Sequence, residues 1–237
     1  LRGGDPRYNE PAVSGVIEAI GGALAEMKPV RAAAGRAVDG RVAFNRRFVM
    51  RDGTAECHPE SCSSRILHRE GPMDPEVGVV TFTDPEGNVV SALLHHTSHP
   101  CHGFGGNEVI ADWSGVWCDR MEDRFGNDCV PLVMNGCCGN VHHTDHLDPE
   151  YKPDHRRMGR LLAESADRAL EDMTELDTED FRCTRRVVDI PRREVPDELL
   201  EEARELLREH PQPLWKDEEH VRVEWDWVYA VGIMDIA

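Results

Sequence analysis

The 237-residue sequence predicts an α/β fold, a mixed β-sheet flanked by helices. Two β-rich runs, 77–83 and 89–94, are joined by Asp-Pro-Glu-Gly-Asn, a turn sequence typical of a β-hairpin. Segments with helical periodicity alternate with short apolar runs along the rest of the chain. We find no internal repeat, low-complexity tract or linker, and therefore expect a single domain of the catalytic type over residues 1–237.

The first half of the chain is expected to begin with a helix and to continue with strands. Between Pro11 and Met27 apolar side chains recur every three or four residues, which predicts an amphipathic helix that Lys28-Pro29 ends. Residues 41–51 are rich in Val and Phe and predict a strand. The polar stretch 52–75 is expected to be a long surface loop before the hairpin.

The second half is expected to alternate between helices and strands in the same way. Helices are predicted at 112–125, where Gly126-Asn127-Asp128 ends the pattern, from beyond Pro153 to about Met173, and at 196–209. Strands are predicted at 130–134, as a short buried strand, and at 181–190 and 221–233.

Charge and apolar patterning restrict the class of protein. The net charge of −18 disfavours nucleic acid and anionic membrane surfaces as partners, because both require basic patches. No apolar run approaches a transmembrane segment, and no signal peptide opens the chain, which begins at Leu1 and is expected to lack its original N-terminus. The compartment and the oligomeric state stay open. The eight cysteines form no CxxC pair, and we expect reduced, partly buried thiols.

The candidate chemistry lies in two Gly-rich loops that hold seven of the 12 histidines. They are His95-His96-Thr97-Ser98-His99-Pro100-Cys101-His102 and His142-His143-Thr144-Asp145-His146. Each follows a predicted strand, where α/β folds place their functional loops. Neutral imidazole is the commonest metal ligand, so the clustering predicts a metal site, with zinc favoured. The alternative is a surface loop with solvated histidines.

Nearby residues allow more than one role. Asp112 either orients a ligating imidazole or caps the helix that follows. The turn Asn135-Gly136-Cys137-Cys138-Gly139-Asn140 would let backbone N–H groups face an oxyanion or a ligand. Cys137 or Cys138 beside His142 is a weaker hypothesis of a Cys/His nucleophile.

Five segments, taken in order, resemble the neutral/alkaline non-lysosomal ceramidase-like family from about Tyr8 to Ile236. The segments are Phe44-Asn45-Arg46-Arg47, residues 71–79, the strand into His99-Pro100, residues 107–115 and residues 135–140. The resemblance implies that residues 1–237 are part of the N-terminal catalytic domain of such a protein. It also implies a zinc-dependent amidohydrolase site.

The resemblance implies roles for individual residues. It places the central zinc-ligating histidine of the family on His99, and His102 in the same loop is the second candidate ligand. The family's Gly-Asp-x-Ser-Pro motif falls on residues 139–143, where His142 stands in place of the serine. We therefore expect His142 or His143 to act as an extra ligand or proton shuttle, and Asp112 to orient His99.

These expectations predict a zinc-dependent hydrolase that cleaves an amide or ester bond in a small-molecule or lipid-like substrate, not necessarily ceramide. An alternative is a degenerate, non-catalytic relative that binds a metal or a small molecule, which the loss of the serine favours. A third possibility is a metal site that serves stability alone.

Overall fold

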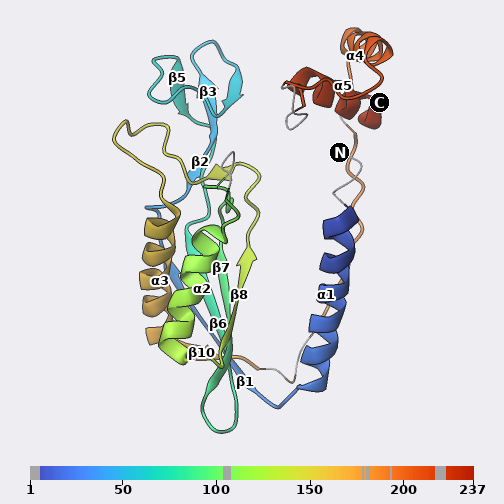
Figure 1. Ribbon diagram of the computed structural model, residues 1–237. Coiled ribbons are helices and arrows are strands. Elements are labelled where there is room, and N and C mark those ends of the chain that lie inside the picture. Colours follow the sequence, from blue (N-terminus) through green and yellow to red (C-terminus); the bar gives the residue numbers. More distant parts are fainter. Residues whose placement is uncertain (1–5, 104–107, 178, 180–181, 193, 217–222) are drawn as a thin grey trace. The chain divides into compact units, whose positions relative to one another are not determined.

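The computed structural model describes residues 6–103, 108–177, 179, 182–192, 194–216 and 223–237, with the backbone alone at positions 6–8. The chain forms two compact units, residues 1–181 and residues 182–237 (Figure 1). The predicted mixed sheet with flanking helices is confirmed, and it lies in the first unit.

The main sheet has five strands in the order β10-β1-β6-β7-β8. They are β1 (Arg31–Val38), β6 (Glu76–Thr83), β7 (Val89–His96), β8 (Val130–Asn135) and β10 (Thr174–Glu175). The β6–β7 pair is the predicted antiparallel hairpin, whereas β7 and β8 are parallel, which makes the sheet mixed. Because parallel strands end at the same edge, the chain leaves β7 and β8 on the same side of the molecule.

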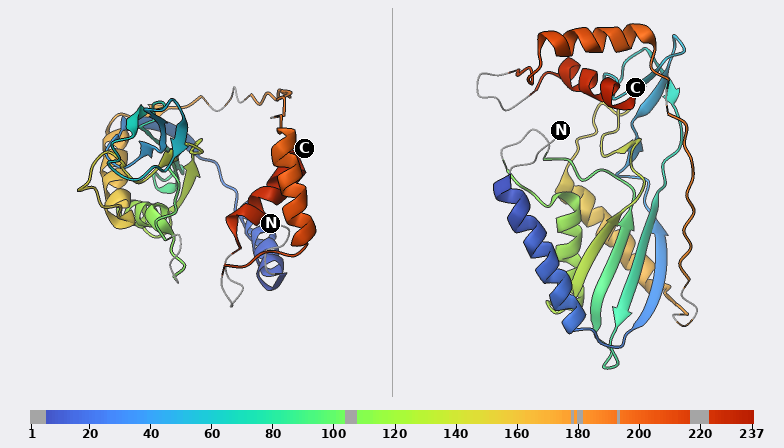
Figure 2. Two further views of the ribbon diagram at one scale, coloured as in Figure 1. Left: turned by 90° about the horizontal axis from the view of Figure 1, so that it is seen from above. Right: turned by 90° about the vertical axis from the view of Figure 1, so that its right-hand side faces the viewer.

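Two amphipathic helices cover one face of this sheet, α2 (Asp112–Phe125) and α3 (His155–Glu171) (Figures 1 and 2). Both confirm predicted helices. Trp113 and Trp117 of α2 and Leu162 of α3 are fully buried in the core. At the start of α3 the side chain of Asp154 accepts hydrogen bonds from two backbone N–H groups, so the helix begins where its free donors are satisfied.

Two small sheets extend from the end of the main sheet where β7 and β8 stop (Figure 1). The first pairs β2 (Phe44–Asn45) with β9 (Val141–His142), with Phe44 opposite His142. The second contains β4 (Ala55–Cys57), β3 (Arg47–Met50) and β5 (Ile66–Arg69). The β2–β9 pair thus attaches the 44–70 segment to the second histidine loop.

The remaining helices are α1 (Pro6–Ala25) in the first unit and α4 (Asp197–Glu209) and α5 (Trp225–Ile236), which pack together in the second. The helices α1 and α4 confirm predictions. The apolar side chains of α1 at Val13, Ile17 and Leu24 are each more than half exposed. None of the described helices has the combination of length and apolarity that crossing a membrane requires.

Several predicted elements are wrong in detail. The strand expected at 41–51 is divided into β2 and β3, and the loop expected at 52–75 contains β4 and β5. The strand β1 was not predicted. The strand β8 was expected to be buried, but Val130, Leu132 and Met134 are 58%, 54% and 54% exposed, because β8 is an edge strand with one open face.

The two C-terminal strands are also wrong. Position 181 lies outside the described residues, and 182–190 forms no regular structure, with Val187, Val188 and Ile190 exposed. Positions 221 and 222 lie outside the described residues, and the rest of the expected strand 221–233 belongs largely to α5. The strand was predicted because apolar residues alternate along 221–233, but Trp225–Ile236 forms a helix that packs against α4, so tertiary packing overrides the local alternation.

Candidate metal centre

The loops that follow β7 and β8 bring the two histidine clusters together. His95 lies opposite Met134 and His96 opposite Asn135 in the parallel pair, so both loops begin at the same edge of the sheet. The pairing of Phe44 with His142 then holds the second loop across this edge. Residues about 40 positions apart in the sequence therefore meet at one site.

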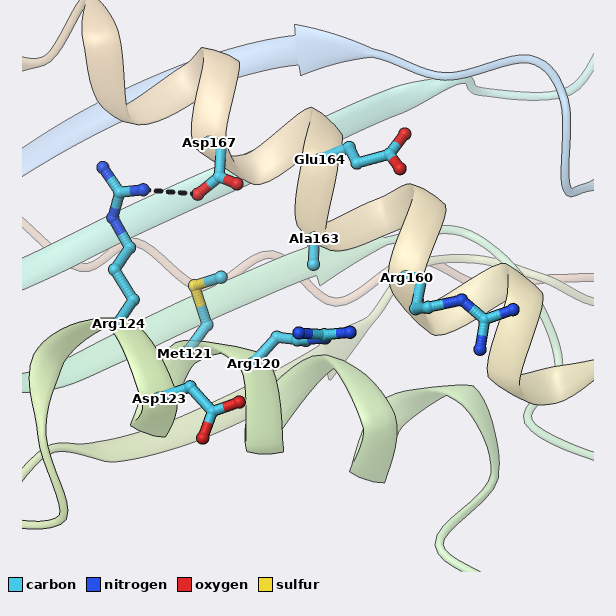
Figure 3. A pocket seen from close by; sticks show the side chains of 8 residues that line it. All are labelled: Arg120, Met121, Asp123, Arg124, Arg160, Ala163, Glu164 and Asp167. Carbon is cyan, nitrogen blue, oxygen red and sulfur yellow. Dashed lines mark hydrogen bonds and ion pairs between the residues drawn. The ribbon is translucent and has the colours of Figure 1, made fainter.

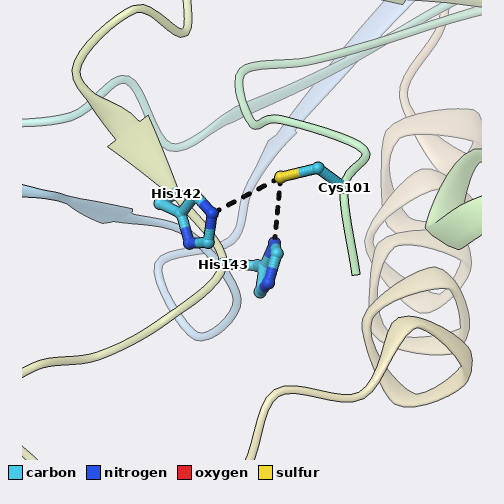
Figure 4. Close-up of side chains that lie close together, drawn as sticks. All are labelled: Cys101, His142 and His143. Atoms are coloured by element: carbon cyan, nitrogen blue, oxygen red, sulfur yellow. Dashed lines mark hydrogen bonds between the residues drawn. The ribbon is translucent and has the colours of Figure 1, made fainter. Parts of the chain in front are cut away.

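Three side chains at this site form what we call the Cys101 cluster: Cys101, His142 and His143 (Figure 4). The Cys101 Sγ atom lies 3.4 Å from His142 Nε2 and 4.0 Å from His143 Nδ1. All three potential ligand atoms lie within 4.8 Å of one another. One thiol and two imidazoles match the ligand types that zinc prefers.

A carboxylate holds the histidine next to the cluster. Asp112 Oδ1 accepts a hydrogen bond from His102 Nδ1 at 2.7 Å, and Asp112 Oδ2 accepts from the His102 backbone N–H at 2.6 Å. The His102 ring stacks on His143 with centroids 3.6 Å apart and planes at 17°. Asp112 therefore fixes an imidazole, as expected for a carboxylate near a metal site, but its partner is His102 and not His99.

Asp112 is not the cap of α2, because Ala111 occupies that position and Asp112 is the first helical residue. Its φ of 56° lies in the left-handed region, which few residues other than glycine, asparagine and aspartate adopt. Burial acts to raise the pKa of Asp112, but hydrogen bonds from the Trp113 backbone and from His102 outweigh it, so the pKa lies below its ordinary value. The group is therefore ionised at neutral pH.

The two histidines of the cluster stay neutral over a wide pH range. Burial is the largest cause that lowers the pKa of His142, to about 3. The nearby His143, His58 and Arg46 side chains act in the same direction, because each would repel a protonated ring. Burial and His102 lower the pKa of His143 to about 4. A neutral imidazole keeps a lone pair free for a metal ion, so both rings are in the form that ligation requires.

The predicted ligand His99 lies in the same site, paired with another thiol. Its Nδ1 is 3.3 Å from Cys138 Sγ, and its ring centroid is 6.3 Å from that of His142. Asn135 Nδ2 donates to Cys138 Sγ at 3.3 Å. The hypothesis that Cys137 or Cys138 pairs with His142 does not fit, since His142 faces Cys101, Cys138 faces His99 and Cys137 is exposed.

The donor atoms of the Cys101 cluster could hold a metal ion. The ligand nitrogen of His142 would be Nε2, which faces Cys101 Sγ. Its other ring nitrogen, Nδ1, is buried without a hydrogen-bond partner in the part of the chain that the structure describes. Three protein ligands also leave a fourth position of a tetrahedral zinc ion for water or substrate.

Sequence reasoning missed three residues of this site. Cys101 lies between His99 and His102, and its position within that loop was a usable signal, but it was grouped with the other cysteines as a reduced, partly buried thiol. His58 and Arg46 lie 3.1 Å apart beside the second histidine loop. His58 belongs to the segment predicted as a surface loop, and nothing in its local sequence indicates its position.

A pocket outside the Cys101 cluster lies between α2 and α3 and has a volume of about 400 Å³ (Figure 3). Its lining combines three arginines with three acidic residues: Arg120, Arg124, Arg160, Asp123, Glu164 and Asp167, together with Met121 and Ala163. Arg124 and Asp167 form an ion pair with N and O atoms 2.6 Å apart. Because its charges are mixed, this pocket favours no class of ligand.

The fold and the Cys101 cluster together define a class: mixed-sheet α/β proteins with a Cys/His donor set at the ends of a parallel strand pair. Solved structures similar to this chain include ceramidases. The neutral ceramidase from Pseudomonas aeruginosa superposes with a TM-score of 0.51 at 20% identity, over 67% of this chain and 25% of that one. A ceramidase complexed with C2 superposes with a TM-score of 0.52 at 19% identity, over the same shares.

The likeness to these structures shows a ceramidase-like fold. The chain matches about a quarter of the length of each of them. No family model matches the sequence. A search of curated protein sequences gives no match.

Proposed function

We propose that this chain carries the metal centre of a zinc-dependent hydrolase that cleaves an amide or an ester bond. The observation that carries the proposal is the Cys101 cluster, which lies where β7 and β8 end in a ceramidase-like fold. Ends of parallel strands are where α/β folds bind ligands, because the sheet holds the loops in place.

The proposed ligand atoms are Cys101 Sγ, His142 Nε2 and His143 Nδ1. Zinc bound there would supply a Lewis acid that activates water and polarises a carbonyl group. His102 uses Nδ1 for Asp112, which leaves Nε2 to accept a proton or to act as a further ligand. His99, beside Cys138, stays a predicted ligand at the rim of the same site.

The substrate class follows from the likeness in fold alone. The two similar structures described above are ceramidases, so an amide in a small-molecule or lipid-like compound is the first candidate. The serine expected from the family motif is His142 here, and hydrolysis would therefore depend on the metal centre rather than on a serine nucleophile.

The experiment that tests this proposal measures zinc content and hydrolysis together. We expect about one zinc ion per chain, and hydrolysis of p-nitrophenyl esters or amides that chelation abolishes and zinc restores. His142→Ala and Cys101→Ala should lose both zinc and hydrolysis. His68→Ala is the matched control, because His68 is exposed on β5 and its Nδ1 lies 2.7 Å from the Arg69 carbonyl.

Zinc bound by the wild type without hydrolysis of any substrate would favour a non-catalytic, metal-binding relative, as the replacement of the family serine by His142 suggests. Absence of zinc from the folded wild-type chain after incubation with the metal would overturn the proposed site. Zinc retained by both ligand variants would do the same.

A further inference from the structure

Four side chains outside the Cys101 cluster form a continuous hydrogen-bonded chain: Arg46, His58, His146 and Ser61. Arg46 Nη1 lies 3.1 Å from His58 Nε2. His58 Nδ1 lies 3.1 Å from His146 Nε2, and His146 Nδ1 lies 3.2 Å from Ser61 Oγ. Both nitrogens of each imidazole are thus used.

The donor and acceptor roles in these hydrogen bonds are fixed from the Arg46 end. A guanidinium can only donate, so His58 Nε2 must be the acceptor. In a neutral imidazole the other nitrogen then carries the proton, and His58 Nδ1–H donates to His146 Nε2. The same argument places a proton on His146 Nδ1, which donates to the Ser61 hydroxyl. Arg46 therefore determines the tautomer of both histidines.

Hydrogen bonds to backbone groups hold these four residues against the second histidine loop. Arg46 donates to the Gly139 carbonyl from Nη2 at 2.7 Å and from Nε at 3.2 Å. The backbone N–H of His58 donates to the Arg46 carbonyl, and that of Cys62 donates to the His146 carbonyl. Both His58 and Cys62 have positive φ, 56° and 58°, a conformation that costs energy and persists only where the surroundings fix it.

His58, the second member of this hydrogen-bonded chain, packs against a ligand of the proposed metal centre. The rings of His58 and His142 meet edge to face, with centroids 4.6 Å apart and planes at 88°. The Nδ1 atom of His142 has no hydrogen-bond partner among the described residues. Ligating histidines are usually oriented by a hydrogen bond from that second nitrogen. Here the neighbours of the His142 ring are the Cys101 thiol at Nε2, the His143 ring with its centroid 3.9 Å away, and the His58 ring.

His143 shows the same arrangement on the other side of the cluster. Its ring stacks on His102, and Asp112 holds His102 through Nδ1. Each cluster histidine is thus packed against a second histidine, and that second histidine is anchored by a charged side chain. Asp112 is the anchor for His102, and Arg46 is the anchor for His58.

We propose that His58 is a positioning residue for His142, held in one tautomer by the hydrogen-bonded chain from Arg46 to Ser61. Its consequence for metal binding and hydrolysis rests on the proposed function. The tautomers of His58 and His146 and the packing of His58 against His142 do not depend on the proposed function, because they can be measured without a metal ion.

The first experiment is ¹⁵N NMR of the imidazole rings in the metal-free chain. Wild-type His58 and His146 should both give the signature of a neutral Nδ1–H tautomer, and Arg46→Lys should keep it because lysine is also a donor. Arg46→Met should lose it, because the donor that fixes the tautomer is gone. An Nε2–H tautomer at His58 in the wild type, or no change in Arg46→Met, would overturn the proposal.

The second experiment compares His58→Ala with His68→Ala. His68 lies on β5, and the proposed site does not include it. In the metal-free chain His58→Ala should shift the ring signals of His142, and His68→Ala should not. In zinc competition assays His58→Ala should bind about 10- to 100-fold more weakly, and the absorption spectrum of bound Co²⁺ should change. His142 signals and zinc affinity that both equal the wild type in His58→Ala would overturn the positioning role.

Failure of the two proposals can be told apart. If the wild type binds no zinc, the proposed function is wrong, while the tautomers and the His142 shifts still decide the role of His58. If His58→Ala does not fold, Ser61→Ala replaces it. Ser61 is exposed, and its replacement removes only the last acceptor of the hydrogen-bonded chain. His146 should keep its Nδ1–H tautomer in this variant, because His58 Nδ1–H still donates to His146 Nε2. A change of His146 to the Nε2–H tautomer would show that Ser61 rather than Arg46 sets the donor and acceptor roles and would overturn the proposal.

Discussion

The carboxylate of Asp112 binds His102 twice, through the imidazole Nδ1 at 2.7 Å and through the backbone N–H at 2.6 Å. It also accepts a hydrogen bond from the Trp113 backbone at 2.7 Å. A single buried side chain thus connects the first histidine loop to the beginning of α2. The loop that carries Cys101 is therefore fixed to the helix that carries the main core.

Replacement of Asp112 by Ala removes all three of these hydrogen bonds. We expect the free energy of unfolding to fall by about 2–3 kcal/mol, because hydrogen bonds to a buried charged group are among the strong ones. Urea denaturation measures this loss. Asp112→Asn is the control, since Asn tolerates positive φ and keeps an acceptor, and it should lose less. Equal losses in both variants would contradict this account.

The pKa values of His142 and His143 predict how the stability of the metal-free chain depends on pH. Unfolded histidine protonates near pH 6.5, whereas the folded values are about 3 for His142 and about 4 for His143. Between these limits the unfolded state binds more protons, so stability should fall as pH drops below about 6.5 and level off near the folded values.

Urea denaturation between pH 7 and pH 4 checks this prediction. His143→Asn should reduce the slope of stability against pH, because one of the two suppressed titrations is gone. His68→Asn serves as the control because His68 is exposed on β5, outside the proposed site. A His143→Asn slope equal to that of the wild type would contradict the proposed burial of a neutral ring.

Local sequence patterns predicted the elements that have a clear beginning and end. The helix α2 was predicted with its observed bounds, since its periodicity stops at Gly126. The β6–β7 hairpin followed from its turn sequence. The strand β1, Arg-Ala-Ala-Ala-Gly-Arg-Ala-Val, was missed because Ala, Gly and Arg are not typical strand residues, and it is a strand because β6 pairs along its whole length.

The candidate site was only partly predictable for a different reason. The two histidine loops were identified by their composition, but their contact depends on the parallel pairing of β7 with β8 and on the β2–β9 pair. Pairing partners that lie far apart in the sequence are not visible in local patterns. For that reason the partner of Asp112, the role of Cys101 and the position of His58 required the structure.

Close packing of α2 against α3 depends on Gly159. A Cβ atom at this position would lie 2.5 Å from Val116 Cβ and 2.8 Å from the Trp113 carbonyl oxygen, closer than real Cβ contacts. Gly159→Ala should therefore lower the free energy of unfolding by about 1–3 kcal/mol. Gly40→Ala is the matched control, because nothing lies within 4 Å of its added Cβ. Its stability should change by less than about 1 kcal/mol.

Thermal or urea denaturation of the two glycine variants distinguishes tight packing from a general intolerance of substitution. A large loss in Gly159→Ala with little change in Gly40→Ala would support the close approach of the two helices. Equal stability of Gly159→Ala and the wild type would contradict the 2.5 Å separation between an added Cβ atom at position 159 and Val116 Cβ.

The sequence and the structure favour different zinc ligands, and one comparison separates them. The resemblance places a ligand at His99, whereas the described geometry brings His142 and His143 to Cys101 and pairs His99 with Cys138. If the Cys101 cluster alone holds the ion, His99→Ala should keep most of the zinc and His142→Ala should lose it. If His99 is also a ligand, both variants should lose it. Elemental analysis of each folded variant, with circular dichroism to confirm folding, gives the answer. Zinc lost only in His99→Ala would exclude the Cys101 cluster and leave His99 as the ligand predicted from the sequence.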